Sequence, residues 1–408
     1  MKIIILGAGA RGNFYAKYAT KFGAQIVGVA EPNVAKRDLY CKKYNIPSEG
    51  QFSSWEEALA GEKYADAVIN STVDRLHFHS TVSALEKGYH VLLEKPMTPI
   101  KEECVEIVEL AEKKNLTLMI AHVLRYTPFF AKLKELLDAK IIGEIINFQL
   151  TENIAYWHMA HSYVRGNFRN EDLASPWILA KSCHDLDILV YLLGKKCHKV
   201  TSIGNLMRFK SENAPLGAPK RCLDGCPVEK TCPYFAPAFY LQQMQEVTWP
   251  TSMISTDDSL RGRYEALQTG PYGRCVYHCD NNVPDHQTTI FEFDGGTTAS
   301  FNMVGFSSGE GARTMRIFGT LGDIRGHVEK GELEINHFLK GEQQVIKIEK
   351  NLINSGHSGG DSRLTQDFLA TVSGNSEANK SSARVSLQSH FMAFAAEVSR
   401  RENRTVIL

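Results

Sequence analysis

Lys95 is the first residue whose type and position suit acid–base chemistry. It follows the apolar pair Leu92-Leu93 and an acid, Glu94, at the end of a predicted parallel strand, where sheets of this kind bind ligands. Pro96 restricts Lys95 to extended geometry. A lysine in this place can hydrogen-bond a substrate hydroxyl and support proton transfer, especially if burial lowers its pKa. The alternative is a surface lysine at a strand end.

Lys181, His184 and Asp187 form a second group, near the start of a predicted helix. Successive spacings of three place the three side chains on one face of that helix. The positive end of the helix dipole disfavours protonation of His184, which suits a general base. The alternative is structural: His184 and Asp187 would only satisfy each other at a helix terminus.

A glycine-rich loop follows the first apolar run of the chain, in the sequence Ile-Ile-Ile-Leu-Gly-Ala-Gly-Ala-Arg-Gly over 3–12. A strand, then Gly-x-Gly-x-x-Gly, then a helix predicts a dinucleotide phosphate site rather than a plain glycine turn. The first glycine would make the turn, the second admit the pyrophosphate and the third let the helix pack closely. The loop residues predicted to contact the cofactor are Gly7, Gly9, Ala10, Arg11 and Gly12.

Glu31 ends the second predicted strand, about 20 residues beyond the glycines, where a carboxylate binds the 2′-hydroxyl of the adenosine ribose. Because a carboxylate repels a 2′-phosphate, Glu31 favours NAD over NADP.

Composition excludes several classes of protein. The 408 residues carry a formal net charge of zero, whereas a nucleic-acid binder is expected to have a basic surplus. No apolar stretch is long enough to span a bilayer, and the chain opens on a core strand rather than a secretion signal. We therefore expect a cytoplasmic protein, in which the nine cysteines are thiols or metal ligands rather than disulfides.

Two domains are predicted within an α/β protein. Strands and helices alternate over 1–121, which predicts a Rossmann-type parallel sheet. Over 122–408, strand patterns without intervening helices predict an α+β domain with a mainly antiparallel open sheet, which would bind substrate and form a homodimer or homotetramer. The predicted strands are 2–6, 25–30, 67–70, 89–93, 117–121, 144–152, 198–206, 287–294, 298–306, 313–319 and 344–349. The predicted late helices are 361–373 and 383–399.

An irregular segment over about 208–285 is rich in Pro, Gly and Cys and is predicted to be an insertion. Three cysteines within eleven residues could wrap a tetrahedral Zn²⁺ if a fourth ligand arrives, and such a metal would hold a segment that has little core. An iron–sulfur cluster and free, partly buried thiols are the alternatives. The predicted zinc ligands are Cys222, Cys226, Cys232 and Cys275, with His278 and Cys279 as alternatives to the fourth.

Taken in order, the glycine motif, Glu94-Lys95-Pro96, Arg125-Tyr126 and His184-x-x-Asp187 before Leu192-Leu193-Gly194 resemble the glucose–fructose oxidoreductase/inositol dehydrogenase (Gfo/Idh/MocA) family. The agreement extends over nearly the whole chain. The resemblance implies that Lys95 lies by the nicotinamide, that His184 acts on the carbinol hydroxyl and that Asp187 helps to hold a polyol. It also implies cofactor contacts from Ser71, Thr72, His77, Glu94 and Lys95.

One position departs from the family pattern. Many members carry an aspartate four residues before the histidine, whereas this chain has Ala180, with Lys181 beside it. We interpret Lys181 as a replacement that lowers the pKa of His184 and binds a substrate oxygen. The resemblance also implies that the loop over 357–361 reaches the site, although Asp361 could simply cap the helix after it.

The segment over 155–166 combines aromatic residues, two histidines and an arginine, which suits a sugar, because rings pack on C–H faces while polar tips fix hydroxyls. A polar loop over the sheet edge is the alternative. His122 and Tyr126 follow the last strand of the first domain and should face the domain boundary. The predicted substrate contacts are His122, Tyr126, Trp157, His161, Arg165 and Asp187.

Together these residues predict an NAD-dependent oxidoreductase acting on a secondary alcohol of a sugar, polyol or glycoside. Two alternatives stay open at this point. A redox-assisted glycosidase would oxidise its substrate transiently, eliminate the aglycone and release no NADH. A dinucleotide-binding sensor would perform no chemistry.

Overall fold

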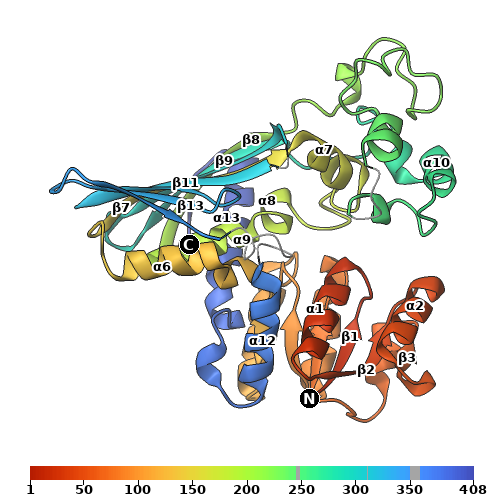
Figure 1. Ribbon diagram of the computed structural model, residues 1–408, viewed down its shortest axis with the longest axis horizontal. Helices are drawn as coiled ribbons and strands as arrows, with labels where there is room; N and C mark the ends of the chain where they lie inside the picture. The colour runs from red at the N-terminus through yellow and green to blue at the C-terminus, as the bar shows by residue number, and fades with distance from the viewer. Residues whose placement is uncertain (245–248, 310, 350–358) are drawn as a thin grey trace.

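The first sheet is parallel, and its strands are apolar on both faces because helices cover both (Figure 1). Its six strands follow the order β3-β2-β1-β4-β5-β6, which reverses direction between β1 and β4. Such a switch point is where open α/β sheets bind nucleotides. The strands are β1 (Lys2–Leu6), β2 (Gln25–Ala30), β3 (Gln51–Phe52), β4 (Ala67–Asn70), β5 (His90–Leu93) and β6 (Leu118–Ile120). The helices are α1 (Ala10–Lys21), α2 (Val34–Tyr44), α3 (Trp55–Ala60), α4 (His77–Glu86) and α5 (Lys101–Lys113).

The computed structural model describes all residues except 245–248, 310 and 350–358. Within the described ranges, no helix combines the length and the apolar character that a membrane crossing requires.

The second sheet is mixed and mostly antiparallel, in the order β14-β13-β12-β11-β7-β10-β9-β8-β15. Among the described strands of this sheet, only β7 and β10 pair in parallel. The two sheets together confirm the predicted fold class. The strands are β7 (Ile145–Ala155), β8 (Cys197–Asn205), β9 (His286–Phe293), β10 (Thr298–Ser307), β11 (Gly311–Gly319), β12 (Gly322–His327), β13 (Glu332–His337), β14 (Gln343–Lys347) and β15 (Val406–Ile407).

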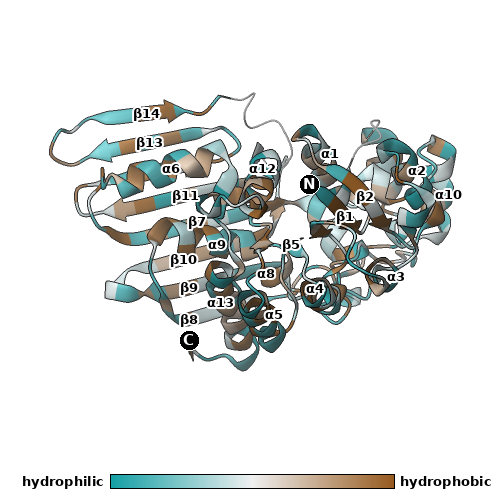
Figure 2. Ribbon diagram, turned by 90° about the horizontal axis from the view of Figure 1, so that it is seen from below, coloured by the Kyte–Doolittle hydropathy of each residue, from teal (hydrophilic) through white to brown (hydrophobic). Residues whose placement is uncertain are grey.

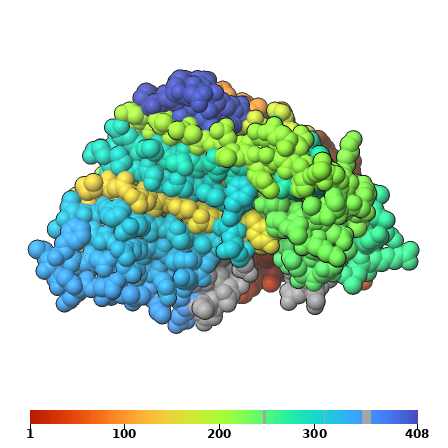
Figure 3. Space-filling model, turned by 90° about the horizontal axis from the view of Figure 1, so that it is seen from above, coloured from red at the N-terminus to blue at the C-terminus, as the bar shows by residue number. Residues whose placement is uncertain are grey.

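Helices cover one face of the second sheet. Seen from below, α6 (Pro128–Asp138), α9 (Cys183–Leu193) and α13 (Ala383–Glu402) lie against its strands (Figure 2). The burial alternates accordingly along β7: Phe148 and Leu150 are buried, whereas Gln149 between them is exposed. The opposite face lies at the surface, where β7 (yellow) runs beside the blue and cyan strands (Figure 3).

The chain returns to the first sheet near its C-terminus. Helix α12 (Gly360–Val372) packs beside α1, with Leu364 and Phe368 in the same apolar cluster as Tyr15 (Figure 1). Helix α13 then touches both sheets, and the peptide N–H of Ile120 donates to the carbonyl of Ser381, just before that helix. The two domains are therefore linked at several places along the chain.

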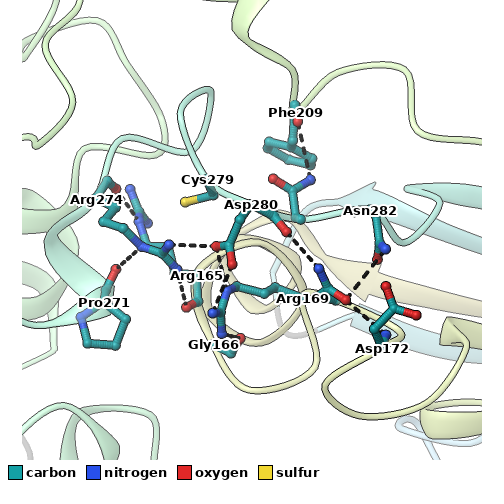
Figure 4. Close-up of polar contacts among 12 residues, drawn as sticks. Arg165, Gly166, Arg169, Asp172, Phe209, Pro271, Arg274, Cys279, Asp280 and Asn282 are labelled. Atoms are coloured by element: carbon teal, nitrogen blue, oxygen red, sulfur yellow. Dashed lines mark hydrogen bonds and ion pairs between the residues drawn. The ribbon is translucent and has the colours of Figure 1, made fainter.

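The insertion packs beside one end of the second sheet and carries its own small apolar cluster around Tyr240 and helix α10 (Leu260–Thr269). An ion-pair group fastens it to the segment after β7 (Figure 4). Asp280 accepts from Arg169 Nε at 2.7 Å and from Arg274 Nη1 at 2.6 Å. Hydrogen bonding to Arg169 is the main cause that holds the pKa of Asp280 far below its ordinary value.

Candidate active site at the domain boundary

The glycine loop has the geometry that a bound pyrophosphate requires. Gly7 adopts a φ of 90°, and a Cβ there would lie 2.6 Å from the carbonyl oxygen of Ser71. A Cβ on Gly12 would lie 2.1 Å from the carbonyl oxygen of Gly7, so α1 can pack this closely only with glycine. A Cβ on Gly9 would meet no atom within 4 Å. The space above Gly9, at the start of α1, fits a phosphate group.

Glu31 lies at the end of β2, directly beside this loop. Its carboxylate is mostly buried and accepts from the backbone N–H of Ala8 and of Asn33, both at 3.0 Å. The position and the charge of the carboxylate fit the ribose hydroxyls of NAD, and they oppose a 2′-phosphate.

Ser71, Thr72 and His77 border the other side of the loop, beyond β4. Ser71 Oγ donates to the carbonyl of Gly7 at 2.9 Å, and Thr72 Oγ1 donates to Asn70 Oδ1 at 2.8 Å. The His77 ring lies between the carbonyl oxygens of Pro96 and Thr72, at 2.7 and 3.1 Å. These contacts fix the backbone around the site, and cofactor contact by the three residues stays a prediction.

The side chain of Arg11 is bound by other residues of the protein. Its guanidinium forms ion pairs with Glu94 and Asp361 and contacts the Tyr15 hydroxyl. Although burial opposes ionisation of Glu94, the charges of Arg11 and Lys95 hold its pKa below the ordinary value. Within the predicted loop, this arrangement leaves the backbone of Ala10 and Arg11, rather than the arginine side chain, available to phosphates.

Lys95 reaches from the first domain to the second. Its Nζ donates to the carbonyl of Ala180 at 2.7 Å, at the end of helix α8 (Trp177–Ala180). A residue of α13 holds the turn that carries Lys95. The backbone N–H of Met97, in this turn, donates to Nε2 of His390 at 2.9 Å. The other ring nitrogen of His390 lies 2.9 Å from the carbonyl of Ser386, which it can reach only as a donor. His390 is thus fixed in one neutral tautomer.

His184 lies in the first turn of α9 and is 5% exposed. Its ring meets that of His122 edge to face, with centroids 5.9 Å apart. His122 is fully buried, and burial is the main cause that lowers its pKa well below the ordinary value. The two histidines therefore meet where α9 packs against the segment that follows β6.

Asp187 is fully buried, and both of its carboxylate oxygens accept from Arg125, at 2.6 and 2.7 Å. Burial raises the pKa of Asp187 even though the Arg125 charge opposes this. The pair holds α9 against η3 (Val123–Tyr126). Tyr126 is also buried, and its hydroxyl is 2.9 Å from Ser381 Oγ. Both substrate contacts stay predictions.

Lys181 belongs to a buried network of charges that the sequence did not reveal. Its Nζ is 3.0 Å from Glu152 Oε1 on β7. Arg313 on β11 joins the other oxygen of Glu152 at 3.0 Å and reaches Asp185 at 2.8 Å. Lys181 is therefore paired with a buried carboxylate of the second sheet.

The segment after β7 packs under the insertion. The Trp157 Nε1 donates to the carbonyl of Gly309 at 2.9 Å, and the His161 ring is 2.7 Å from the Tyr240 hydroxyl. Arg165, 2% exposed, donates to the carbonyls of Arg274 and Tyr234, both at 2.7 Å. The structure thus places His161 and Arg165 among protein partners, and only Trp157 of these three is more than marginally exposed.

Models of known protein families match both halves of the chain. The family model described as an oxidoreductase family with an NAD-binding Rossmann fold matches residues 1–122, and its partner model for the C-terminal alpha/beta domain matches 134–408. The chain belongs to the Gfo/Idh/MocA oxidoreductases. Its relatives include YteT of Bacillus subtilis (strain 168), which is 26% identical over 85% of this oxidoreductase and 82% of YteT. The scyllo-inositol 2-dehydrogenase (NAD(+)) of the same strain is 24% identical over 68% and 70%.

Solved structures agree with this fold. A levoglucosan dehydrogenase in complex with NADH and levoglucosan superposes with a TM-score of 0.73 at 18% identity, covering 100% of this oxidoreductase and 99% of that chain. An Agrobacterium radiobacter oxidoreductase in complex with NAD+, L-tartaric acid and magnesium gives 0.71 at 16%, covering 100% and 98%. The inositol 2-dehydrogenase of Corynebacterium glutamicum (strain R), a further relative, is matched over only 55% of its length.

The four cysteines predicted to bind zinc do line one small cavity in this oxidoreductase, together with Arg165 and Tyr234. However, the described residues contain no group of three or more potential ligands placed to hold a metal. The zinc prediction is therefore not supported. The nine cysteines are free thiols.

Several residues of the site were missed by the sequence analysis. Glu152 and Arg313 come from strands whose partners are distant in the chain, and His390 lies more than 200 residues beyond the lysine turn it holds. One signal was present: Glu152 occupies an inward position of β7 between the buried Leu150 and Ile154. A charged residue at a buried strand position needs a partner of opposite charge. Such a residue therefore indicates a functional or structural site. Of the predicted loop over 357–361, residues 357 and 358 lie outside the described residues.

Proposed function

We propose that this oxidoreductase removes hydride from a secondary alcohol of a sugar, polyol or glycoside and transfers it to NAD. The observation that carries the proposal is the hydrogen bond from Lys95 Nζ to the carbonyl of Ala180. It places the lysine at the end of β5 beside the first turn of α9, which bears His184. Burial raises the pKa of the neighbouring Cys183 thiol to about 12, and the Lys95 charge opposes this rise, which supports the same proximity.

The chain's own residues fit NAD. The open space above Gly9 and the N-terminus of α1 would receive the pyrophosphate, and Glu31 would bind the adenosine ribose. When bound, NAD supplies the nicotinamide carbon that accepts hydride.

Two side chains would manage the proton of the alcohol. We assign His184 as the base that takes the hydroxyl proton, since it lies in the first turn of a helix, where the dipole disfavours a prior charge. Lys95 uses one N–H for Ala180 and keeps two donors for the substrate oxygen. Lys181, paired with Glu152, would orient a neighbouring hydroxyl. The charged residues around the site are paired with one another, and this favours a substrate that carries no charge.

The open face of the second sheet supports a homo-oligomer. Thr288, Ile290 and Ile203 lie on its outer side and are exposed in the single chain. We propose a homodimer or homotetramer formed through this face.

The experiment is to follow NADH absorbance with purified protein, NAD and a panel of sugars, polyols and aryl glycosides, with aglycone release measured in the same wells. We expect NADH from one substrate class. We also expect His184→Ala to lower kcat/KM by about 10²- to 10⁴-fold, the usual contribution of a general base. Aglycone released without NADH would contradict the proposal, and so would full activity in His184→Ala.

A further inference from the structure

Seven aromatic rings pack into one group that we call the aromatic wall. It is formed by the segment after β7 and by the insertion, which lie far apart in the sequence. Trp157 stacks on Phe239 with centroids 5.4 Å apart, and His161 stacks on Tyr272 at 4.7 Å with planes only 14° apart. The members of the aromatic wall are Trp157, His158, His161, Phe239, Tyr240, Trp249 and Tyr272.

Trp249 is the outer member of the aromatic wall. Its ring centroid lies 5.4 Å from that of Trp157, 4.8 Å from that of His158 and 5.7 Å from that of His161. Even so, 44% of the residue is exposed. Tryptophan is usually well buried, and this one rests on three rings while a large part of it stays open. Such a ring presents a supported platform to a ligand.

The aromatic wall is connected through β7 to the charged network around Lys181. Burial lowers the pKa of His158 well below its ordinary value, and the charges of Lys181 and Lys95 lower it further. The helix that bears Trp157 and His158 follows β7 directly, and β7 carries Glu152, the partner of Lys181.

Hydrogen bonds and ion pairs within the protein hold the aromatic wall in place before any ligand binds. Trp157 and His161 are tied by the hydrogen bonds to Gly309 and Tyr240. Asp280 links Arg169, which follows the first segment of the aromatic wall, to Arg274 of the insertion (Figure 4). A platform that is ordered in advance loses little entropy on binding.

We propose that Trp249 and the aromatic wall form a subsite for a second sugar ring, so that the substrate is a disaccharide or longer glycoside of which one ring is oxidised. This inference rests on the proposed function. A single ring at Lys95 and His184 would leave Trp249 exposed, whereas a ring linked to it would cover the tryptophan. Sugars suit this surface because their C–H faces pack on aromatic rings while their hydroxyls reach polar groups such as Lys181.

The test measures binding rather than turnover. Calorimetric titration of the protein supplied with NADH would compare lactose with methyl β-galactoside, cellobiose with methyl β-glucoside, and maltose with methyl α-glucoside. We expect at least one disaccharide to bind about tenfold more tightly than its methyl glycoside, the scale of one aromatic contact. Trp249→Ala should remove this difference and leave the methyl glycoside unchanged, while Trp249→Phe should keep most of it. Phe338→Ala, at another exposed ring (61%), is the matched control and should change nothing.

The inference is overturned if no disaccharide binds the wild type more tightly than its methyl glycoside. It is also overturned if Trp249→Ala weakens both ligands alike, or neither. NADH formation, measured separately with NAD, tests the proposed function. Selective disaccharide binding without NADH would therefore support the subsite and count against the dehydrogenase.

Discussion

At the scale of single residues, the site contains two kinds of group. Some charges are paired within the protein, and other side chains would act on substrate. Glu152 and Asp185 are almost fully buried, Arg313 has 14% of its side chain exposed, and each finds an opposite charge within 3.0 Å. Desolvation makes an unpaired charge in such a place very costly. Lys181 is the member of this network closest to solvent, with 18% of its side chain exposed. It is therefore the member best placed to exchange a protein contact for a substrate contact.

Lys181→Ala should raise KM by roughly tenfold, the scale of one lost hydrogen bond to a charged group, while kcat changes less. The reason is that Lys181 is assigned to orient a hydroxyl and not to move the proton. Steady-state kinetics on the substrate found in the panel would measure this. Lys199→Ala removes a lysine from an exposed pair with Glu292 and serves as the control. Unchanged KM and kcat in Lys181→Ala would reject the role.

At the scale of elements, the sequence was most informative where a pattern is local. The apolar runs gave β1, β2 and β4 with the observed bounds, and the late helices over 361–373 and 383–399 correspond to α12 and α13. The hairpin β12–β13 is absent from the predicted strands, because its apolar residues alternate with charged ones. Only pairing with β11 shows that Ile324 and Ile335 face the core.

The same distinction holds for the site. The glycine loop, Lys95 and His184 could be predicted because each sits in a short motif whose neighbours fix its place. The surroundings of Asp187 and Arg165 could not, since their partners come from other elements: Arg125 for the first, and carbonyls of the insertion for the second. Nothing local to Trp249 indicated that it would lie on rings from residues 157–161.

Helix α13 acts on the site through His390, which holds the turn after Lys95. Burial lowers the pKa of His390 to about 4, against 6.5 for a free histidine. Between pH 4 and pH 6.5, His390 is therefore protonated in the unfolded chain and neutral in the folded protein. The stability from this group is therefore complete above pH 6.5 and is lost as pH falls toward 4, by roughly 3 kcal/mol in all.

His390→Gln should therefore unfold more easily than wild type at pH 7.5, with a difference that shrinks as the pH approaches 4. Urea unfolding of both proteins at several pH values would measure this difference. Because glutamine does not titrate, groups remote from His390 affect both proteins equally and their contributions cancel. A difference that stays constant from pH 7.5 to 4 would contradict a neutral, buried His390.

At the scale of the whole molecule, the site exists only because two sheets meet. Lys95 and the glycine loop belong to the first sheet, and His184 and Lys181 belong to the second domain. The Lys95–Ala180 hydrogen bond, the Arg125–Asp187 pair and the His390 contact all cross this boundary. The architecture therefore brings the glycine loop and Lys95 of one half to the boundary with the half that carries His184 and Lys181.

The most direct measurement is kcat/KM for Lys95→Met, His184→Ala and the double variant, on whichever alcohol yields NADH. If both residues serve one proton transfer, each single change should cost about 10²- to 10⁴-fold. The double variant should then be little worse than the poorer single one, because residues that act as a unit are not additive. Single variants close to wild type, or losses that multiply fully in the double variant, would contradict a shared site for Lys95 and His184.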